Sequence, residues 1–210
     1  MGDIILKMTG IDKRFSGVHA LNNVDFELRS GEVHALMGEN GAGKSTLMKV
    51  LCGIHSRDAG EIEYFGKPVN FSNIAESQAA GISIIHQELN MMNHLTVAQN
   101  IYIGREPKKA GVYIDDRKME QDARNLFKRI GIHINPSVKL GTLTVGKQQM
   151  VEIAKAISHD SKLLILDEPT AALTQPEVEE LFRIMNDLRD KGIGMIYISH
   201  RMDEINRISD

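Results

Sequence analysis

Residues 38–46 read Gly38-Glu39-Asn40-Gly41-Ala42-Gly43-Lys44-Ser45-Thr46, and the rest of the chain can be interpreted outward from them. This stretch matches the phosphate-binding pattern G-x-x-x-x-G-K-[S/T] at each fixed position. Residues 32–37, which are apolar enough for a buried strand, precede it, and an amphipathic segment that stops at Gly53 follows it. The pattern therefore stands between a predicted buried strand and a predicted helix, which is the context in which nucleoside triphosphates bind.

The residue types in this loop explain how phosphates would be held. Glycine lacks a Cβ, so the backbone can adopt positive φ and turn its N–H groups toward phosphate oxygens. Lys44 would reach the β- and γ-phosphates, and the Ser45 hydroxyl is placed to bind Mg²⁺. A glycine-rich turn without a ligand is the alternative, and the complete pattern disfavours it. We assign the whole stretch to nucleotide binding: Gly38, Glu39, Asn40, Gly41, Ala42, Gly43, Lys44, Ser45 and Thr46.

Length and composition limit the possible classes of protein. With 210 residues and 42% hydrophobic content, the chain can form one good core, or one core and a small subdomain. Its 25 basic and 28 acidic residues give a net charge of −3 without a long block of like charge, which argues against nucleic-acid binding. The single cysteine, Cys52, excludes an intramolecular disulfide and suits a reducing cytosol.

No apolar run reaches the roughly 18 residues that a membrane-spanning helix needs, and residues 1–3 do not start a signal-peptide pattern. We therefore expect any role at a membrane to be peripheral or to depend on a partner.

Two kinds of strand are predicted. Residues 4–8, 21–28 and 60–67 form short apolar or alternating segments, which favour a half-exposed antiparallel sheet. Residues 82–85, 162–167 and 195–199 are nearly continuous apolar runs, which are typical of buried parallel strands. From about residue 89 to residue 158, apolar residues instead recur at helical spacing, and this predicts a helical insert. A capping box, Thr174-Gln175-Pro176-Glu177, predicts one further helix, which Gly192 would end.

Polar residues follow each of the buried parallel strands. His86-Gln87-Glu88 comes after the first, Asp167 and Glu168 end the second, and His200 follows the third. Open α/β sheets place ligand groups at the carboxyl ends of their strands. Asp167 can hold Mg²⁺ through water, and Glu168 can polarise an attacking water. An acidic turn and a structural histidine are the simpler alternatives, and the upstream phosphate loop disfavours the first of them.

These motifs together resemble an ABC-type ATPase domain over nearly the whole chain. The phosphate loop, Gln87, Leu143-Thr144-Val145-Gly146-Lys147-Gln148-Gln149, the strand ending at Glu168, and His200 occur in that family's order and spacing. The resemblance implies an α/β P-loop NTPase with a mostly parallel core sheet, an N-terminal antiparallel β layer and a helical subdomain. We expect one domain, with residues 1–88 and 159–210 as core and β layer and residues 89–158 as the helical subdomain.

Four segments point to a particular group within the ABC family: residues 38–48, 85–90, 148–156 and 198–202. These segments are similar to the ATP-binding subunits of bacterial monosaccharide importers, the ribose, galactose, arabinose and xylose group. In that family two ATPase domains pair head to tail around ATP. The resemblance implies adenine stacking for Phe15, the general base for Glu168 and a γ-phosphate contact for His200. It also implies Mg²⁺ and water sensing for Gln87, and contact with the opposite nucleotide for Thr144 and Gly146.

The same resemblance implies ATP and Mg²⁺ as ligands, and three kinds of partner. These are a membrane permease subunit, a second ATPase domain from the same full-length chain or a homodimer, and indirectly a periplasmic sugar-binding protein. The expected location is the cytoplasmic face of the bacterial inner membrane. Two alternatives stay open: a non-transport ABC ATPase that acts as a regulatory or ribosome-associated switch, and an importer of nucleosides.

Three features depart from the family pattern. The usual Leu-Ser-Gly-Gly-Gln signature is Leu143-Thr144-Val145-Gly146-Lys147 here, so a hydroxyl is kept while bulk and charge are added. Thr174 stands where an Asp is usual. Members of the sugar group carry two fused ATPase domains, so we expect this sequence to be an N-terminal portion that stops before the last strands of the first domain.

Overall fold

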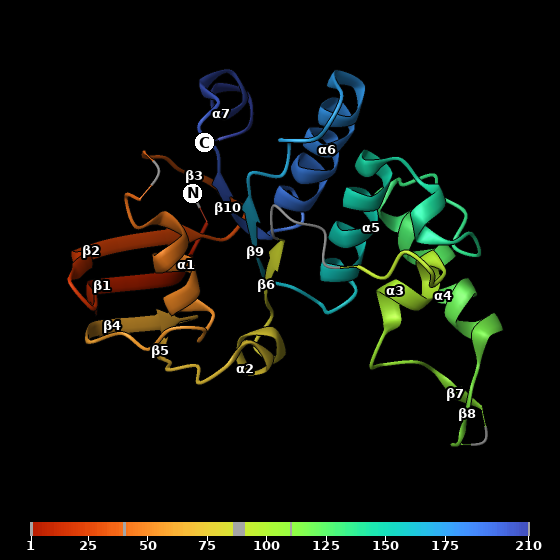
Figure 1. Cartoon of the computed structure of the whole chain (residues 1–210), viewed down its shortest axis with the longest axis horizontal. Coiled ribbons are helices and arrows are strands. Elements are labelled where there is room, and N and C mark those ends of the chain that lie inside the picture. Colours follow the sequence, from red (N-terminus) through yellow and green to blue (C-terminus); the bar gives the residue numbers. More distant parts are fainter. Residues whose placement is uncertain (1, 40, 86–90, 110, 210) are drawn as a thin grey trace. The chain divides into compact units, whose positions relative to one another are not determined.

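The computed structural model describes residues 2–39, 41–85, 91–109 and 111–209 (Figure 1). The chain divides into two compact units. The core unit contains Met1–Ile84, Ser161–Glu168 and Leu188–Asp210. The helical unit contains Ile85–Asp160 and Pro169–Asp187. The domain boundaries expected from the sequence stay a prediction.

The first sheet of the core unit is antiparallel. Its strands are β1 Ile4–Phe15, β2 Val18–Arg29, β4 Ala59–Tyr64 and β5 Lys67–Pro68. They lie side by side in the order β2-β1-β4-β5 and are coloured red to gold in Figure 1. Leu6, Met8 and Ile11 of β1 are buried, and the intervening residues are more exposed. This burial of one face confirms the half-exposed antiparallel layer that the alternation predicts.

The second sheet of the core unit has the order β3-β10-β9-β6, and β10 runs parallel to both β3 and β9. The strands are β3 Val33–Leu36, β6 Ile82–Ile85, β9 Leu163–Asp167 and β10 Gly194–Ile198. Every residue of β10, and all of β9 except Asp167, is buried. Strands buried on both faces need continuous apolar runs, which explains why these segments do not alternate.

Helices of the core unit are α1 Lys44–Leu51, α2 Ile74–Ala79 and α7 Met202–Ile208. Helix α1 buries Leu47, Met48 and Leu51 in an apolar cluster that also contains side chains of both sheets. Cys52 directly follows α1 and is buried, and its burial raises the pKa of the thiol to about 12. The thiol is therefore protonated at neutral pH and acts as a small apolar residue.

The central strands should dominate the stability of this unit. Ile165 in β9 is fully buried within the apolar cluster. We expect Ile165→Ala to lower the free energy of unfolding by about 2–5 kcal/mol, because it removes buried apolar groups and leaves a cavity. Val112, whose side chain is 75% exposed, offers the matched control. Val112→Ala should change the free energy by less than about 0.5 kcal/mol in the same chemical denaturation experiment. Equal losses in both variants would contradict this assignment of the core.

The helical unit consists mainly of α3 Val97–Tyr102, α4 Asp116–Ile130, α5 Val145–Ile157 and most of α6 Gln175–Arg189. It also contains a 3₁₀ turn, Leu140–Thr142, and a short hairpin, β7 Lys108–Lys109 with β8 Tyr113–Ile114. The helices confirm the predicted helical character. The hairpin was not predicted, because two residues per strand give too short a pattern to recognise.

Buried side chains of α4 recur at the predicted helical spacing, and Gly131 ends the helix in a left-handed conformation. Within the described residues, no helix combines the length and apolar character required to cross a bilayer.

Candidate functional site

Three neighbouring parallel strands end at one edge of the second sheet. Ile198 at the end of β10 pairs with Leu36 of β3 on one side and with Asp167 of β9 on the other. The phosphate loop, Glu168 and His200 follow these three strand ends in the sequence. The core sheet therefore brings the predicted phosphate loop, acidic pair and histidine to the same edge, where α/β sheets bind their ligands.

The loop between β3 and α1 has the backbone shape of an anion cradle. Gly43 has a φ of 91°. A Cβ at Gly43 would lie 2.6 Å from the carbonyl oxygen of Ala20, so a larger residue cannot fit without a shift of the backbone. Gly41 has a φ of 87°, and a Cβ there would meet nothing within 4 Å. The loop is thus tightly packed on β2 at Gly43 and open at Gly41, where a ligand can approach.

Lys44 and Ser45 are the first residues of α1. The ammonium of Lys44 donates hydrogen bonds to the carbonyl oxygens of Gly38, at 2.5 Å, and Glu39, at 3.0 Å. Among the described residues, no side chain caps the N-terminus of α1. Its first backbone N–H groups and the Lys44 charge therefore suit an anion. Ser45 is exposed, and Ala42 and Thr46 belong to the same loop and first turn. Two of the predicted site residues, Asn40 and Gln87, lie outside the described residues.

Glu168 and His200 contact each other directly. Nδ1 of His200 lies 3.0 Å from Oε1 of Glu168. The backbone N–H of Glu168 donates to the carbonyl oxygen of Ile198, and Glu168 has a φ of 46°. A left-handed conformation is costly for a glutamate, by roughly 1–3 kcal/mol, and such strain is concentrated at functional sites. Asp167, the last residue of β9, directly precedes Glu168.

Phe15, the predicted adenine-stacking residue, is the last residue of β1 and is 40% exposed. Its ring centroid lies 5.1 Å from that of His55, edge to face, and 5.5 Å from Nζ of Lys13. Lys13 is paired with Asp58 at 2.9 Å. The backbone N–H of Arg14 and then Lys13 lower the pKa of Asp58, which therefore stays ionised. His55 and Lys13 thus contact the ring of Phe15, which is still partly open to a ligand.

Thr144 and Gly146, the predicted signature residues, lie in the helical unit at the start of α5. Thr144 is the N-cap of this helix, and its Oγ1 accepts a hydrogen bond from the backbone N–H of Lys147. The hydroxyl of Thr144 also donates to Oε1 of Glu177 at 3.0 Å.

Lys13, His55 and Glu177 were not predicted as site residues. A sequence signal existed only for Glu177, which the capping box singled out as a residue of the α6 N-terminus. Lys13 and His55 have no such signal, because only the folded sheet brings them to Phe15.

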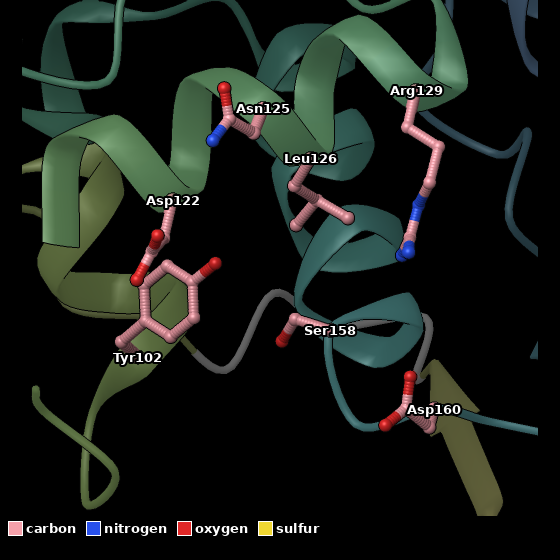
Figure 2. A pocket seen from close by; sticks show the side chains of 7 residues that line it. All are labelled: Tyr102, Asp122, Asn125, Leu126, Arg129, Ser158 and Asp160. Carbon is pink, nitrogen blue, oxygen red and sulfur yellow. The ribbon is translucent and has the colours of Figure 1, made fainter. Parts of the chain in front are cut away.

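A cavity of about 340 Å³ lies in the helical unit (Figure 2). Arg105 packs nearby, where it donates to the carbonyl and hydroxyl oxygens of Ser158. The cavity contains none of the residues predicted to bind nucleotide. It is lined by Tyr102, Asp122, Asn125, Leu126, Arg129, Ser158 and Asp160.

Residues 21–171 match the model of the ABC transporter family. The chain belongs to this family. The match includes the phosphate loop, the signature segment and the Asp167-Glu168 pair, and it leaves Phe15, Glu177 and His200 outside its bounds.

Curated relatives agree with this membership. One, from Burkholderia cenocepacia strain HI2424, is named putative ribose/galactose/methyl galactoside import ATP-binding protein 2; it is 60% identical over 98% of this chain and 40% of its own length. A second, from Albidiferax ferrireducens, is a putative ribose/galactose/methyl galactoside import ATP-binding protein, 54% identical over 98% of the chain and 41% of its own length. The chain thus spans about 40% of the length of these relatives.

Solved structures of ABC cassettes have the same fold. An ATP-binding cassette of an ABC transporter in its ADP conformation superimposes with a TM-score of 0.85 and 27% identity, over 99% of this chain and 85% of that one. A nucleotide-free cassette gives a TM-score of 0.87 and 26% identity, over 99% and 86%. The fold is therefore the α/β P-loop fold of ABC ATPases, with a parallel sheet and an antiparallel sheet.

Proposed function

We propose that this chain binds and hydrolyses ATP and that its hydrolysis powers the import of a monosaccharide across the bacterial inner membrane. The observation that carries the proposal is the common edge of β3, β10 and β9, which brings together the glycine-rich loop with Lys44, the Asp167-Glu168 pair and His200. These are the elements that phosphoryl transfer to water requires: a phosphate cradle, a metal ligand and a base.

Each residue has a distinct role in the proposed reaction. The loop N–H groups and Lys44 bind the phosphates and neutralise their charge. Glu168 orients a water molecule for in-line attack on the γ-phosphate and accepts a proton from that water. His200, 3.0 Å from Glu168, holds this carboxylate and contacts the γ-phosphate. Phe15 stacks on the adenine.

Mg²⁺ fits the same edge because hydroxyl and carboxylate oxygens are its preferred ligands. Ser45 and Asp167 would hold it, and Gln87 is the proposed third ligand. When bound, this ion supplies charge neutralisation at the phosphate oxygens.

The names of the relatives, as import ATP-binding proteins, and the chemistry of the signature segment support the proposed partners. Thr144 and Gly146 bind the nucleotide of a second ATPase domain, either in the same full-length protein or in a homodimer. At the cytoplasmic face of the inner membrane, the pairing of the two ATPase domains acts on a membrane permease subunit. A periplasmic sugar-binding protein delivers the solute to that permease. The names of the relatives support a sugar of the ribose or galactose type.

The sequence is also compatible with two other functions, namely a regulatory or ribosome-associated ABC ATPase and a nucleoside importer. The curated relatives are named as sugar import proteins, and these names support neither the regulatory ATPase nor the nucleoside importer.

The proposal is tested by measuring phosphate release from ATP with Mg²⁺ at several concentrations of the chain. We expect slow hydrolysis whose rate per chain rises with protein concentration, because a complete site needs the signature segment of a second domain. Binding of a fluorescent ATP analogue in parallel separates binding from hydrolysis. A chain that neither binds nor hydrolyses ATP would contradict the proposal. Binding with no hydrolysis at any concentration would limit the chain to the nucleotide-holding part of the enzyme.

A further inference from the structure

The carboxylate of Glu177 joins the starts of two helices in the helical unit. Its Oε2 accepts hydrogen bonds from the backbone N–H of Thr174, at 3.0 Å, and from the hydroxyl of Thr174, at 2.9 Å. Its Oε1 accepts a hydrogen bond from the hydroxyl of Thr144 at 3.0 Å. Helix capping explains the bond from the Thr174 N–H. It does not explain why the carboxylate also binds Thr144, which begins a different helix.

Gly146 shows how closely this carboxylate approaches the signature segment. A Cβ placed on Gly146 would overlap the carboxyl group of Glu177. The carboxylate therefore lies against the first turn of α5, beside both Thr144 and Gly146. These are the two residues for which the proposed function requires contact with the phosphate of a partner's nucleotide. An internal anion already occupies this position.

The hydroxyl of Thr144 has one proton to donate. Phosphate oxygens only accept hydrogen bonds, so Thr144 must donate to them. In this structure the hydroxyl of Thr144 donates its hydrogen bond to Glu177. The N–H of Thr174, the hydroxyls of Thr174 and Thr144 and the charge of Lys147 lower the pKa of Glu177, against a smaller effect of burial, so the carboxylate is ionised at neutral pH. A negative charge at the start of α5 also repels an incoming phosphate while it satisfies the helix dipole.

We propose that Glu177 is a positioning residue that directs the hydroxyl of Thr144 away from an incoming phosphate, so that phosphate must displace an internal carboxylate to bind this segment. The inference rests on the proposed role of Thr144 and Gly146. According to this inference, Glu177, which lies outside the phosphate loop, controls when the signature segment can bind a nucleotide. The Thr174 bonds hold the carboxylate in place and so determine the cost of displacing it.

Glu177→Gln tests this inference with little change in shape. The Thr174 N–H can only donate, so the amide oxygen of Gln would face Thr174, and the amide NH₂ would face Thr144. Thr144 would then accept a hydrogen bond and keep its own proton for phosphate. Gln is also a normal capping-box residue, so α6 should keep its N-terminal cap. Glu179→Gln is the matched control, because it removes the same charge from an exposed position on the same helix.

The measurement is an NMR titration of the chain with inorganic phosphate, followed at the backbone amides of Gly146 and Lys147. We expect phosphate to bind this segment about tenfold more tightly in Glu177→Gln than in the wild type, the gain of one charge-assisted hydrogen bond. Glu179→Gln should match the wild type. Adding Thr144→Val to Glu177→Gln should cancel the gain, because the freed hydroxyl is then absent.

Each outcome of the titration decides the inference. Equal affinity in the wild type and Glu177→Gln, including no binding in either, overturns it, as does an equal gain in Glu179→Gln. ATP hydrolysis by the wild type is measured alongside. If the wild type hydrolyses ATP but Glu177→Gln does not bind phosphate more tightly, the inference is wrong and the proposed function stands. Failure to bind or hydrolyse ATP would remove the proposed function, while the titration would still report whether Glu177 excludes phosphate.

Discussion

Glu168→Gln is expected to reduce ATP turnover by about 10²–10⁴-fold, the range found when a general base is removed, and to leave ATP binding intact. The amide of Gln has nearly the shape of the carboxylate but cannot accept a proton from water. The contact of Glu168 with Nδ1 of His200 can persist with the amide oxygen as acceptor. Because hydrolysis is blocked after binding, the nucleotide-bound pair of domains should accumulate.

Single-turnover phosphate release and size-exclusion chromatography with ATP measure these two effects. Glu61→Gln, at an exposed position of β4, is the control for loss of one negative charge and should keep wild-type turnover. Unchanged turnover in Glu168→Gln would remove Glu168 from the mechanism and leave its left-handed backbone without a functional reason.

Lys44→Ala has the second large expected effect, a loss of turnover of about 10²–10³-fold together with weaker ATP binding. The ammonium of Lys44 lies across the phosphate loop, bonded to the carbonyl oxygens of Gly38 and Glu39. Its removal leaves those carbonyls facing an anion with no positive charge between them. Both binding and hydrolysis should therefore suffer, in contrast to Glu168→Gln.

Calorimetric titration with Mg²⁺ and ATP gives the affinity, and phosphate release gives the rate. Lys49→Ala removes an equal charge from an exposed position in the last turn of the same helix and should leave both quantities unchanged. If Lys44→Ala retained wild-type affinity, the loop would bind phosphate through its backbone alone.

The regular elements could be predicted because their patterns are local. The alternation in β2 and the helical spacing in α4 follow directly from which side chains face the core. The nearly continuous apolar runs of β9 and β10 also indicated that these strands are buried in a parallel sheet. The β7–β8 hairpin was missed, since its strands are too short to show a period. The domain division, the metal ligands and the roles assigned by resemblance stay predictions.

The candidate site was predicted as a set of residue types but not as an arrangement. The glycine loop and the acidic pair have recognisable spacing, so Lys44 and Glu168 could be chosen from the sequence. Glu177 was recognised as a helix cap, and its contact with Thr144 was not foreseen. These two residues are far apart in the chain, and no local pattern encodes which helix N-termini meet.

The sequence by itself determined the phosphate loop and the alternating and buried strands, because each depends on residues that are neighbours along the chain. It also determined the membership of the ABC transporter family, because the order and spacing of motifs along the chain are properties of the sequence. Only the tertiary structure decided that three strand ends share one edge, that His200 meets Glu168, and that Glu177 accepts a hydrogen bond from the hydroxyl of Thr144. The physical reason is that hydrogen bonds depend on distances of about 3 Å between atoms. Separation along the sequence does not specify such distances until the sheets and helices have packed.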